Sequence, residues 1–464
     1  MKRITSLFLF FSFVSVMYAQ HSDYDLSSYK TGDYKRKSLD ADLGSSGVFQ
    51  NDMQNGEDQT FNAKLSFTYN QTKNTRKLYE KMYLRLNGNV DYANKDNEVA
   101  FIQDLGAYDK KKRKENGVDY RLSFNRVGYH YIKENNLFLE FSPLAAFGQF
   151  RNTRRESTVN YVTSPSKNKT RTISANVLIN LGIGKGRLEN VEDARQAVYI
   201  LDELQKKGIL TRELTNDEIN EMATVMTRIK NKRQFDSRIR LIEEIETIDS
   251  LLVANGYIDK SHNTAYYTSL YDNWMYGNTP ERLSGSRISV GITPEYSFNR
   301  MKYDSWQDVG STIDYKDIST LFKGALYIDY RYEKPVKLKF QNSLSVSLRS
   351  ALGKYRFEHY FDQHSLDLYY AWGYYPNTRT YVSLGIGESF NYLKEDFKHS
   401  KDNKSLNSYT YLSSNAYYYL SPQLRMSGTF DLSYSFRRDI SRDLNLNDKH
   451  PRTSFSLGLT YSFF

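Results

Sequence analysis

The chain has 464 residues, no cysteine, 40 tyrosines, 26 phenylalanines and a mean hydropathy of −0.67. The absence of cysteine excludes a disulfide framework and a thiolate metal site, and the low hydropathy excludes a bundle of membrane-spanning helices. The net charge of +10 arises from basic residues interspersed with acidic ones, and without a nucleic-acid-binding motif this pattern predicts no nucleic-acid partner.

The N-terminus predicts a secretory signal peptide over residues 1–19. Lys2 and Arg3 supply the positive charge, Leu7–Val16 is the apolar stretch, and Ala19 precedes the expected cleavage site. The apolar stretch is too short to span a bilayer as a helix. We therefore expect an exported chain, and the lack of cysteine predicts that it carries no lipid anchor.

Most of the remaining chain alternates between apolar and polar residues with a period of two, which is typical of β-strands with one apolar face. The last segment, Arg452–Phe464, is rich in aromatic residues and ends the chain. Such a segment is typical of the closing strand of an outer-membrane β-barrel, although Phe463 is in the apolar phase and Phe464 is not. The clear strands are expected at Thr60–Asn70, Met82–Tyr92, Val118–Ile132, Asn136–Phe150, Thr170–Ile183, Arg287–Asn299, Thr320–Tyr332, Val336–Arg349, His364–Tyr374, Arg379–Asn391, Ser408–Leu420, Gln423–Phe436 and Arg452–Phe464.

The connections predict the topology. Long segments such as Ala93–Gly117 alternate with short turns at Lys133–Asn135, Glu333–Pro335, Pro376–Asn377 and Ser421–Pro422. Outer-membrane barrels have long outer loops, short periplasmic turns and, in bacteria, an even number of strands. The weakly alternating segment Tyr34–Gly44 is therefore needed as a first strand. We expect an antiparallel transmembrane β-barrel of about 14 strands, with 12 or 16 as alternatives.

The alternation is interrupted once, and the interruption divides the chain. Residues 20–187 and 285–464 are expected to form the two halves of the barrel, and residues 188–284 an α-helical insertion. The strand count places this insertion either in the periplasm or inside the lumen as a plug. Its acidic and basic residues nearly balance, which disfavours binding to nucleic acid or anionic lipid.

The insertion is expected to contain about three amphipathic helices, because its apolar residues recur with a period near 3.6. The first helix follows Asn190 as N-cap and ends at Gly208. The second follows a capping box at Thr215–Glu218. The third begins near Phe235, and an aromatic segment, Tyr266–Tyr276, leads back to the barrel. The insertion is interpreted as a structural cap, with a partner-binding or gating module as the alternative.

The whole chain resembles an outer-membrane β-barrel of the kind common in Bacteroidota. The stretches Gly184–Ala194 (GKGRLENVEDA) and Asn231–Asp236 (NKRQFD) are similar to a recurrent helical insertion in such barrels. The resemblance implies the fold and an outer-membrane location. That family has no assigned chemistry, so the resemblance implies no catalytic residues.

Charged residues in the polar phase of the strands are expected to line the lumen, because charge facing lipid costs roughly 2–4 kcal/mol at mid-depth for Arg or Lys. They could form a paired network that stiffens the barrel or line a pore without strong ion preference. Glu388 is in the apolar phase, and a β-bulge is the expected reason. The lumen-lining residues are predicted to be Lys64, Arg85, Asp91, Arg121, Glu140, Glu295, Lys323, Asp329, Arg331, Lys339, Asp367, Arg425 and Asp431.

Two further motifs can be interpreted either as structural features or as binding sites. The run Lys110, Lys111, Lys112, Arg113 and Lys114, with Arg151, Arg154 and Arg155, is expected in outer loops, as a solvated tip or as a contact for lipopolysaccharide phosphates. The run Gly182–Gly186 lacks the spacing of a phosphate-binding loop, and glycine at a tight strand exit explains it.

No catalytic or metal-binding residue is predicted, and no cofactor is expected. His364 and Ser365 are neighbours on a strand and face opposite ways, and HExxH and GxSxG motifs are absent. We expect a porin-like channel or transporter for small polar solutes. The alternatives are a structural protein that docks a periplasmic partner through the insertion, and a membrane-embedded hydrolase. The expected partners are outer-membrane lipid, lipopolysaccharide and, through the C-terminal strand, the barrel-assembly machinery.

Overall fold

The computed structural model describes most of the chain after the expected signal peptide. The terminal Phe463 and Phe464, and with them the question of their phase, lie outside the described residues. The described ranges are 24–52, 56–102, 107–132, 136–159, 165–231, 241–259, 264–276, 282–307, 312–355, 359–397, 403–421, 424–440 and 445–461.

Across these ranges the strands form a single 14-stranded antiparallel sheet, in which each strand pairs with the next one in the sequence. This confirms the expected fold class, including the weak first strand. In the first half they are β1 (Tyr34–Asp52), β2 (Gly56–Asn74), β3 (Leu78–Ile102), β4 (Ala107–Ile132), β5 (Leu137–Val159) and β6 (Ser166–Asn190). In the second half they are β7 (Leu283–Gln307), β8 (Thr312–Lys337), β9 (Phe340–Tyr355), β10 (His359–Tyr374), β11 (Thr380–Phe397), β12 (Asn403–Tyr419), β13 (Leu424–Ile440) and β14 (Asn445–Tyr461).

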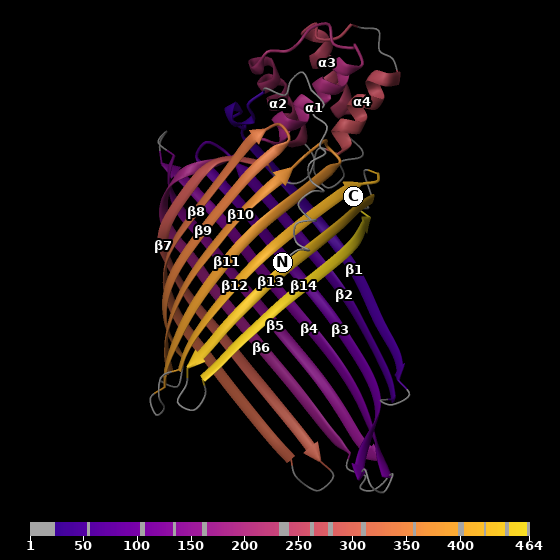
Figure 1. Cartoon of the computed structure of the whole chain (residues 1–464), viewed down its shortest axis with the longest axis vertical. Coiled ribbons are helices and arrows are strands. Elements are labelled where there is room, and N and C mark those ends of the chain that lie inside the picture. Colours follow the sequence, from indigo (N-terminus) through magenta and orange to yellow (C-terminus); the bar gives the residue numbers. More distant parts are fainter. Residues whose placement is uncertain are drawn as a thin grey trace, which may run out of the picture.

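The sheet curls into a barrel-shaped wall, with β8–β14 in front of β1–β6 in the view of Figure 1. Strand pairing follows the order β1 to β14, and within the described ranges no ladder joins β14 back to β1. The four helices gather at one end of the wall, which we call the helix-bearing end. We call the opposite end the far end.

The curvature assigns a concave and a convex face. The Tyr327 hydroxyl of β8 donates a hydrogen bond to Glu140 of β5 at 3.0 Å, so this side chain reaches across β7 and β6. Such a reach is open only to a side chain on the concave face. Apolar side chains in the other phase, such as Leu326 and Ile328, are exposed on the convex face. The sheet is therefore apolar outside and polar inside, as a transmembrane barrel requires.

Several strands are longer than their alternation predicts. β3 continues to Ile102 and β4 begins at Ala107, so most of the segment expected as the loop Ala93–Gly117 is paired in a ladder. The expected turn at Glu333–Pro335 was also wrong: β8 runs to Lys337 and the turn is Leu338–Lys339. Backbone pairing needs no apolar face, so strands continue through polar sequence where alternation gives no signal.

Within its described residues, the insertion contains four α-helices rather than three. They are α1 (Glu192–Lys206), α2 (Asn216–Asn231), α3 (Leu241–Ala254) and α4 (Thr264–Met275). The aromatic segment, expected to be a connection, forms α4 and buries Tyr266, Leu270 and Trp274 at helical spacing. Among the helices that the structure describes, none is both long and apolar enough to cross a bilayer.

The capping box of α2 lies where the sequence predicts it, whereas α1 begins one residue later than expected, with Val191 and not Asn190 in the N-cap position. The Asn190 side chain accepts the backbone N–H of Glu192 at 2.9 Å. Thr215 and Glu218 form the capping box, in which the Thr215 N–H donates to the Glu218 carboxylate at 2.8 Å. Gly208 adopts a positive φ of 67° after α1, a conformation that favours glycine.

The helices share one apolar core that also includes residues from the start of the chain and from a strand turn. Leu26 and Tyr29, which precede β1, are buried in it, and so is Leu338 of the β8–β9 turn. The Tyr29 hydroxyl lies 3.2 Å from the Thr227 hydroxyl of α2. The helical module is thus packed onto the strand ends and lies beyond the wall, not inside it (Figure 1).

Candidate functional site

The predicted lumen-lining residues lie on the concave face, with one correction. Lys339 is not on a strand, because it belongs to the β8–β9 turn, where its carbonyl accepts the Tyr375 N–H at 2.8 Å. On each strand, the others alternate in phase with polar residues that are buried or hydrogen-bonded to one another. Arg85, for example, donates a hydrogen bond to the Ser66 hydroxyl at 3.2 Å. These residues are Lys64, Arg85, Asp91, Arg121, Glu140, Glu295, Lys323, Asp329, Arg331, Asp367, Arg425 and Asp431.

Three of these residues meet in a cavity of about 460 Å³ on the concave face, which we call the chamber. They are Asp329, Arg331 and Asp367. The chamber is also lined by residues that the sequence analysis did not single out: Tyr129 of β4, Arg287 and Ser289 of β7, Ser345 and Ser347 of β9, Tyr369 of β10 and Tyr411 of β12.

One wall of the chamber carries two guanidinium groups side by side. Arg287 and Arg331 are directly opposite each other in the β7–β8 ladder. Arg331 is paired with Glu333 at 2.8 Å, whereas the Arg287 guanidinium lies 4.2 Å from the Tyr129 ring centroid, and no carboxylate among the described residues lies within ion-pair distance of it. Like charges directly opposite each other destabilise a sheet. This wall can therefore accept an anionic group.

The carboxylates of the chamber accept hydrogen bonds within the sheet. Asp329 accepts the Ser347 hydroxyl at 2.5 Å and lies 3.3 Å from Arg349. Asp367 accepts the Ser389 hydroxyl at 2.6 Å. These bonds leave part of each carboxylate's acceptor capacity open, because a carboxylate has about four lone-pair sites. The chamber can thus bind donors on one side and an anion on the other.

A smaller cavity of about 200 Å³ lies beside the chamber. Arg287, Arg331 and Tyr129 line both cavities. The smaller one also contacts Leu188 and Leu283, which are in the strand ends that lead into and out of the helices. The chamber therefore continues toward the helix-bearing end.

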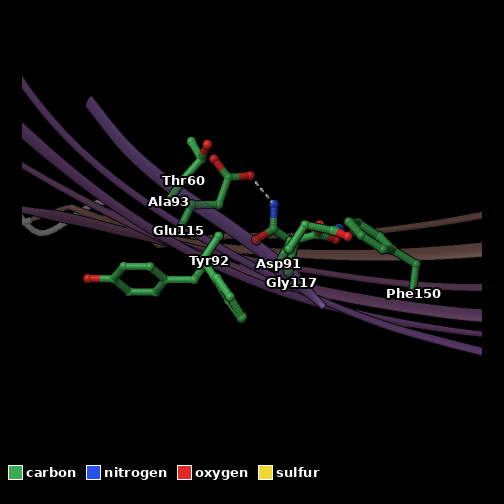
Figure 2. A pocket seen from close by; sticks show the side chains of 10 residues that line it. Thr60, Asp91, Tyr92, Ala93, Glu115, Gly117 and Phe150 are labelled. Carbon is green, nitrogen blue, oxygen red and sulfur yellow. Dashed lines mark hydrogen bonds between the residues drawn. The ribbon is translucent and has the colours of Figure 1, made fainter. Parts of the chain in front are cut away.

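A third cavity, of about 380 Å³, lies in β2–β5 on the far side of the chamber from the helices and is shown in Figure 2. Asp91 is hydrogen-bonded there to Asn89 at 3.0 Å, and Glu115 accepts the Asn152 amide. In Figure 2 the Tyr92 side chain points away from Glu115, because the two belong to opposite faces of the sheet. Because both carboxylates already accept hydrogen bonds from neighbouring amide side chains, this cavity is a weaker candidate than the chamber for binding a solute.

The glycine run lies inside β6 and not at a tight exit from it. A side chain at Gly182 would clash with the Tyr327 hydroxyl, and one at Gly184 would clash with the Phe138 ring. Gly186 has a φ of +101°, which also favours glycine. Because the glycines have no side chains, the side chains of Phe138 and Tyr327 can lie over the β6 backbone on the concave face.

The basic residues expected in outer loops lie on strands, so that expectation was wrong. Arg113 and Arg154 lie on the concave face, where both pair with carboxylates, of Glu115 and Glu156 respectively. Lys112, Lys114, Arg151 and Arg155 are exposed in the opposite phase. The side chains of Lys110 and Lys111 lie outside the described part of the structure.

The helical module is fixed to the strand ends by a buried arginine. Arg282 is fully buried and donates to the backbone carbonyls of Lys337 at 2.6 Å and Phe340 at 2.5 Å, and also to that of Leu338. Burial and the neighbouring Arg195 lower the pKa of Arg282 to about 10, so it is still charged at neutral pH. One side chain thus holds the whole β8–β9 turn against the module.

A second buried contact joins α1, α2 and β1. Asp193 pairs with Lys230 at 2.5 Å and with Arg36 of β1 at 2.9 Å, and it accepts the Thr227 hydroxyl at 2.6 Å. Burial by itself raises the pKa of this carboxyl, but Lys230 and Arg36 outweigh it and hold the pKa at about 2. The ionised form of Asp193 is therefore the form that the fold stabilises.

This contact predicts acid sensitivity. The pKa of Asp193 is lower in the folded state, about 2 against 3.8, so its contribution is complete above pH 4 and is lost as the pH falls toward 2. At pH 6 we expect the free energy of unfolding of the helical module to be about 2 kcal/mol higher in wild type than in an Asp193→Asn variant. This difference should decrease as the pH falls toward 2. Urea unfolding followed by circular dichroism at 222 nm, which reports the helices, measures this. A difference that does not change with pH would contradict it.

Glu388 lies on the convex face without a β-bulge, so that explanation was wrong. The ladder is regular on both sides, with Leu368 opposite in β10 and Thr410 opposite in β12. Instead, the hydroxyls of Ser408, at 2.7 Å, and Thr410 donate to the carboxylate. Two donors from the next strand partly replace the water that lipid would exclude.

Removing this carboxylate is expected to stabilise the barrel. A Glu388→Leu variant should gain about 1–2 kcal/mol, less than the cost known for Arg or Lys on a lipid-facing surface. Reversible urea unfolding in lipid vesicles measures the gain. Asp367→Leu, one residue away on the neighbouring strand's concave face, is the matched control and should not be stabilising. A loss of stability in Glu388→Leu would contradict the lipid-facing assignment.

His130 of β4 and His364 of β10 lie on strands far apart in the sheet. His130 is exposed on the convex face, and His364 pairs with Asp362 at 3.2 Å. His399 lies outside the described residues. Across the described ranges, no three His, Asp or Glu side chains gather as a metal site.

Most of the aromatic lining of the chamber was not predicted from the sequence. Tyr129, Tyr369 and Tyr411 are in the polar phase of their strands, and a count of aromatic residues in that phase could have found them. Arg287 was assigned only as the first residue of a strand. Its position opposite Arg331 depends on the register, which alternation alone leaves open.

An apolar convex face, a charged concave face and a sequential antiparallel meander together define the outer-membrane class of β-barrel. No family model matches the chain, and no curated protein matches it. Among solved structures it is similar to the β domain of the Bordetella autotransporter BrkA, with 9% identity over 94% of this chain and 100% of that chain and a TM-score of 0.22. It is also similar to the ferric yersiniabactin uptake receptor FyuA of Yersinia pestis, with 6% identity, 93% and 68% coverage and a TM-score of 0.29. A third similar structure is that of OmpT, an outer-membrane protein of Vibrio cholerae, with 7% identity over 92% of this chain and 97% of that chain and a TM-score of 0.24.

Proposed function

We propose that this protein is an outer-membrane channel for small polar solutes, with its helical module on the periplasmic side. The observation that carries the proposal is the chamber, where Arg287 of β7 and Arg331 of β8 face the lumen from one ladder position. Asp329, two residues before Arg331 on β8, and Asp367 of β10 face the same space. Charged groups of both signs in a lumen select solutes by charge and hydrogen bonding. Arg287, which has no carboxylate partner among the described residues, favours solutes with an anionic group.

Conductance in planar bilayers tests this proposal with the full-length protein. We expect open-channel currents in potassium chloride and, under a salt gradient, a measurable preference for chloride. An Arg287→Gln variant should lower the anion-to-cation permeability ratio at least twofold. Arg121→Gln, which removes an equal charge from the concave face away from the chamber, should change it less.

The helical module must be included in the same test, since it lies across the helix-bearing end. A variant in which residues 191–282 are replaced by a short Gly-Ser linker should conduct at least as well as wild type. If correctly inserted wild type and this variant both leave the bilayer non-conducting, the channel proposal is wrong.

A specific observation favours a second candidate, the docking of a periplasmic protein on the module. Ile242 of α3 is 73% exposed, and Tyr267 and Tyr271 of α4 are exposed as well. Large apolar side chains on a helical surface are typical of protein contacts. An Ile242→Asp variant that loses a cross-linked partner, while Glu246→Lys on the same helix retains it, would support docking. Equal partner capture by both variants would argue against it.

A further inference from the structure

We infer that the chamber binds the sugar rings of an acidic saccharide, through two tyrosine rings on the concave face of β10–β12 and the arginines of β7 and β8. The inference deepens the proposed function and rests on it, because it names the class of solute that the lumen would admit. The two rings belong to Tyr369 of β10 and Tyr411 of β12, and both line the chamber. We call them the tyrosine tile.

Glycines of β11 make room for the tile. Gly387 is directly opposite Tyr369 in one ladder and Tyr411 in the other. A side chain at Gly387 would clash with the Tyr411 phenol group, and one at Gly385 would clash with the Tyr369 phenol group. Both glycines are buried. The two rings therefore lie over the β11 backbone, in the space that side chains of β11 would otherwise fill.

The tile is nearly flat and continues along the strands. The ring centroids of Tyr369 and Tyr411 are 6.0 Å apart, and the ring planes differ by 16°. Tyr409, two residues nearer the far end on β12, stacks on Tyr411 at 5.5 Å and is 43% exposed. Near-parallel rings over one strand form a broad apolar surface on the wall of the lumen. The electron-rich faces of such rings attract the C–H groups on the face of a pyranose ring.

Groups that match sugar hydroxyls surround the tile. Asp367 is exposed and lies two residues before Tyr369, on the same face of β10. Ser345 and Ser347 of β9 and Asp329 of β8 line the same chamber. A carboxylate accepts hydrogen bonds, and a serine hydroxyl both donates and accepts them. Sugar hydroxyls need this mixture of partners, because each of them is itself both a donor and an acceptor.

The arginines of the chamber favour a sugar that carries a carboxylate. Arg287 and Arg331 are directly opposite each other in the β7–β8 ladder, and both line the chamber with the tile. Arg331 pairs with Glu333, whereas the Arg287 guanidinium lies against the Tyr129 ring. A guanidinium group binds a carboxylate through two parallel hydrogen bonds. A uronic acid supplies this carboxylate next to the ring that the tile would contact.

The balance of charge argues against a nucleotide, which also combines a flat ring with a negative charge. Asp329 and Asp367 line the chamber together with the arginines. A phosphate monoester carries about 1.5–2 negative charges at neutral pH. The two carboxylates would therefore repel it more strongly than they repel the single charge of a uronate. A saccharide with one carboxylate per ring fits the chamber better.

Isothermal titration calorimetry with detergent-solubilised, full-length protein tests this inference. The probes are digalacturonic acid, its neutral dimethyl ester and adenosine monophosphate. We expect the acid to bind about tenfold more tightly than the ester, and adenosine monophosphate to bind more weakly than the acid. An Arg287→Gln variant should bind the acid and the ester about equally, because it loses the group that recognises the carboxylate.

A Tyr411→Leu variant should bind both the acid and the ester about tenfold more weakly, because it removes one ring of the tile. The matched control is Tyr418→Leu, on the same strand but on the convex face, where Tyr418 is 40% exposed. This control should bind both probes as tightly as wild type. If Tyr411→Leu does not fold, Tyr369→Leu removes the other ring of the tile and should show the same loss.

Four results would overturn the inference: no binding of the acid by folded wild type, equal affinity for the acid and the ester, tighter binding of adenosine monophosphate than of the acid, or equal affinities in the tile variant and Tyr418→Leu. The calorimetry does not depend on conductance. Conductance without saccharide binding would therefore contradict this inference alone, and binding by a non-conducting protein would contradict the channel proposal alone.

Discussion

A Lys230→Met variant is expected to lose about 3–5 kcal/mol of module stability, because it leaves a buried carboxylate without its main partner. Lys230 and Asp193 are each 3% exposed, and Lys230 also donates to Gln196 at 2.6 Å. Arg36 still contacts Asp193, but its side chain is one-third exposed. Solvent therefore screens its attraction to the carboxylate more strongly than it screens that of Lys230. The loss is measured by urea unfolding followed at 222 nm.

The double variant Asp193→Leu/Lys230→Met separates the cost of an unpaired charge from the value of the pair. Replacing both partners of a buried ion pair by apolar residues is often neutral. We therefore expect the double variant to recover most of the lost stability. If it is as unstable as Lys230→Met, the packing of these side chains matters more than their charge, and our explanation is wrong.

An Arg282→Gln variant is expected to detach the module from the β8–β9 turn. It removes the guanidinium group that donates hydrogen bonds to the carbonyls of Lys337, Leu338 and Phe340. Each buried carbonyl that is left without a hydrogen bond costs about 1–3 kcal/mol. We expect a total loss of about 3–5 kcal/mol, with trypsin cleavage inside residues 191–281 at least tenfold faster. The strands should remain protected, because their ladders do not involve this side chain.

Arg379→Gln is the matched control for this variant. Arg379 also joins the strand ends to the module, through an exposed pair with Asp272 at 2.9 Å. Exposed pairs contribute about 0–1 kcal/mol, so the control should be cleaved nearly as slowly as wild type. Similar cleavage rates in the two variants would show that Arg282 has no special part in holding the module.

The fold could be predicted from the sequence because its signals are local. Alternation located thirteen of the strands, and an even strand count required the weak β1, which the structure contains. Strand ends were predicted poorly where pairing continues through charged sequence, as in the extension of β4 to Ala107. Helix α4 was missed because its tyrosines are also common in strands, although Tyr266, Leu270 and Trp274 have helical spacing.

The candidate sites depend on register, which the sequence does not specify. That Arg287 is opposite Arg331, or that Tyr369 and Tyr411 are both opposite Gly387, follows from pairing across strands that are separated in the sequence. Likewise, the buried Asp193 and its partly exposed partner Arg36 are brought together only by folding. The sequence therefore predicted the face on which most charged residues lie, and the structure adds which of them are neighbours.

The central claim is that adjacent strand residues face water and lipid alternately, and one pair of variants tests it directly. Because the chain has no cysteine, Asp367→Cys and Leu368→Cys each introduce a single thiol into β10. With the protein in lipid vesicles, the rate of labelling by a charged, membrane-impermeant methanethiosulfonate is measured by mass spectrometry. We predict that Asp367→Cys reacts at least tenfold faster than Leu368→Cys, and equal rates or the reverse order would contradict the claim.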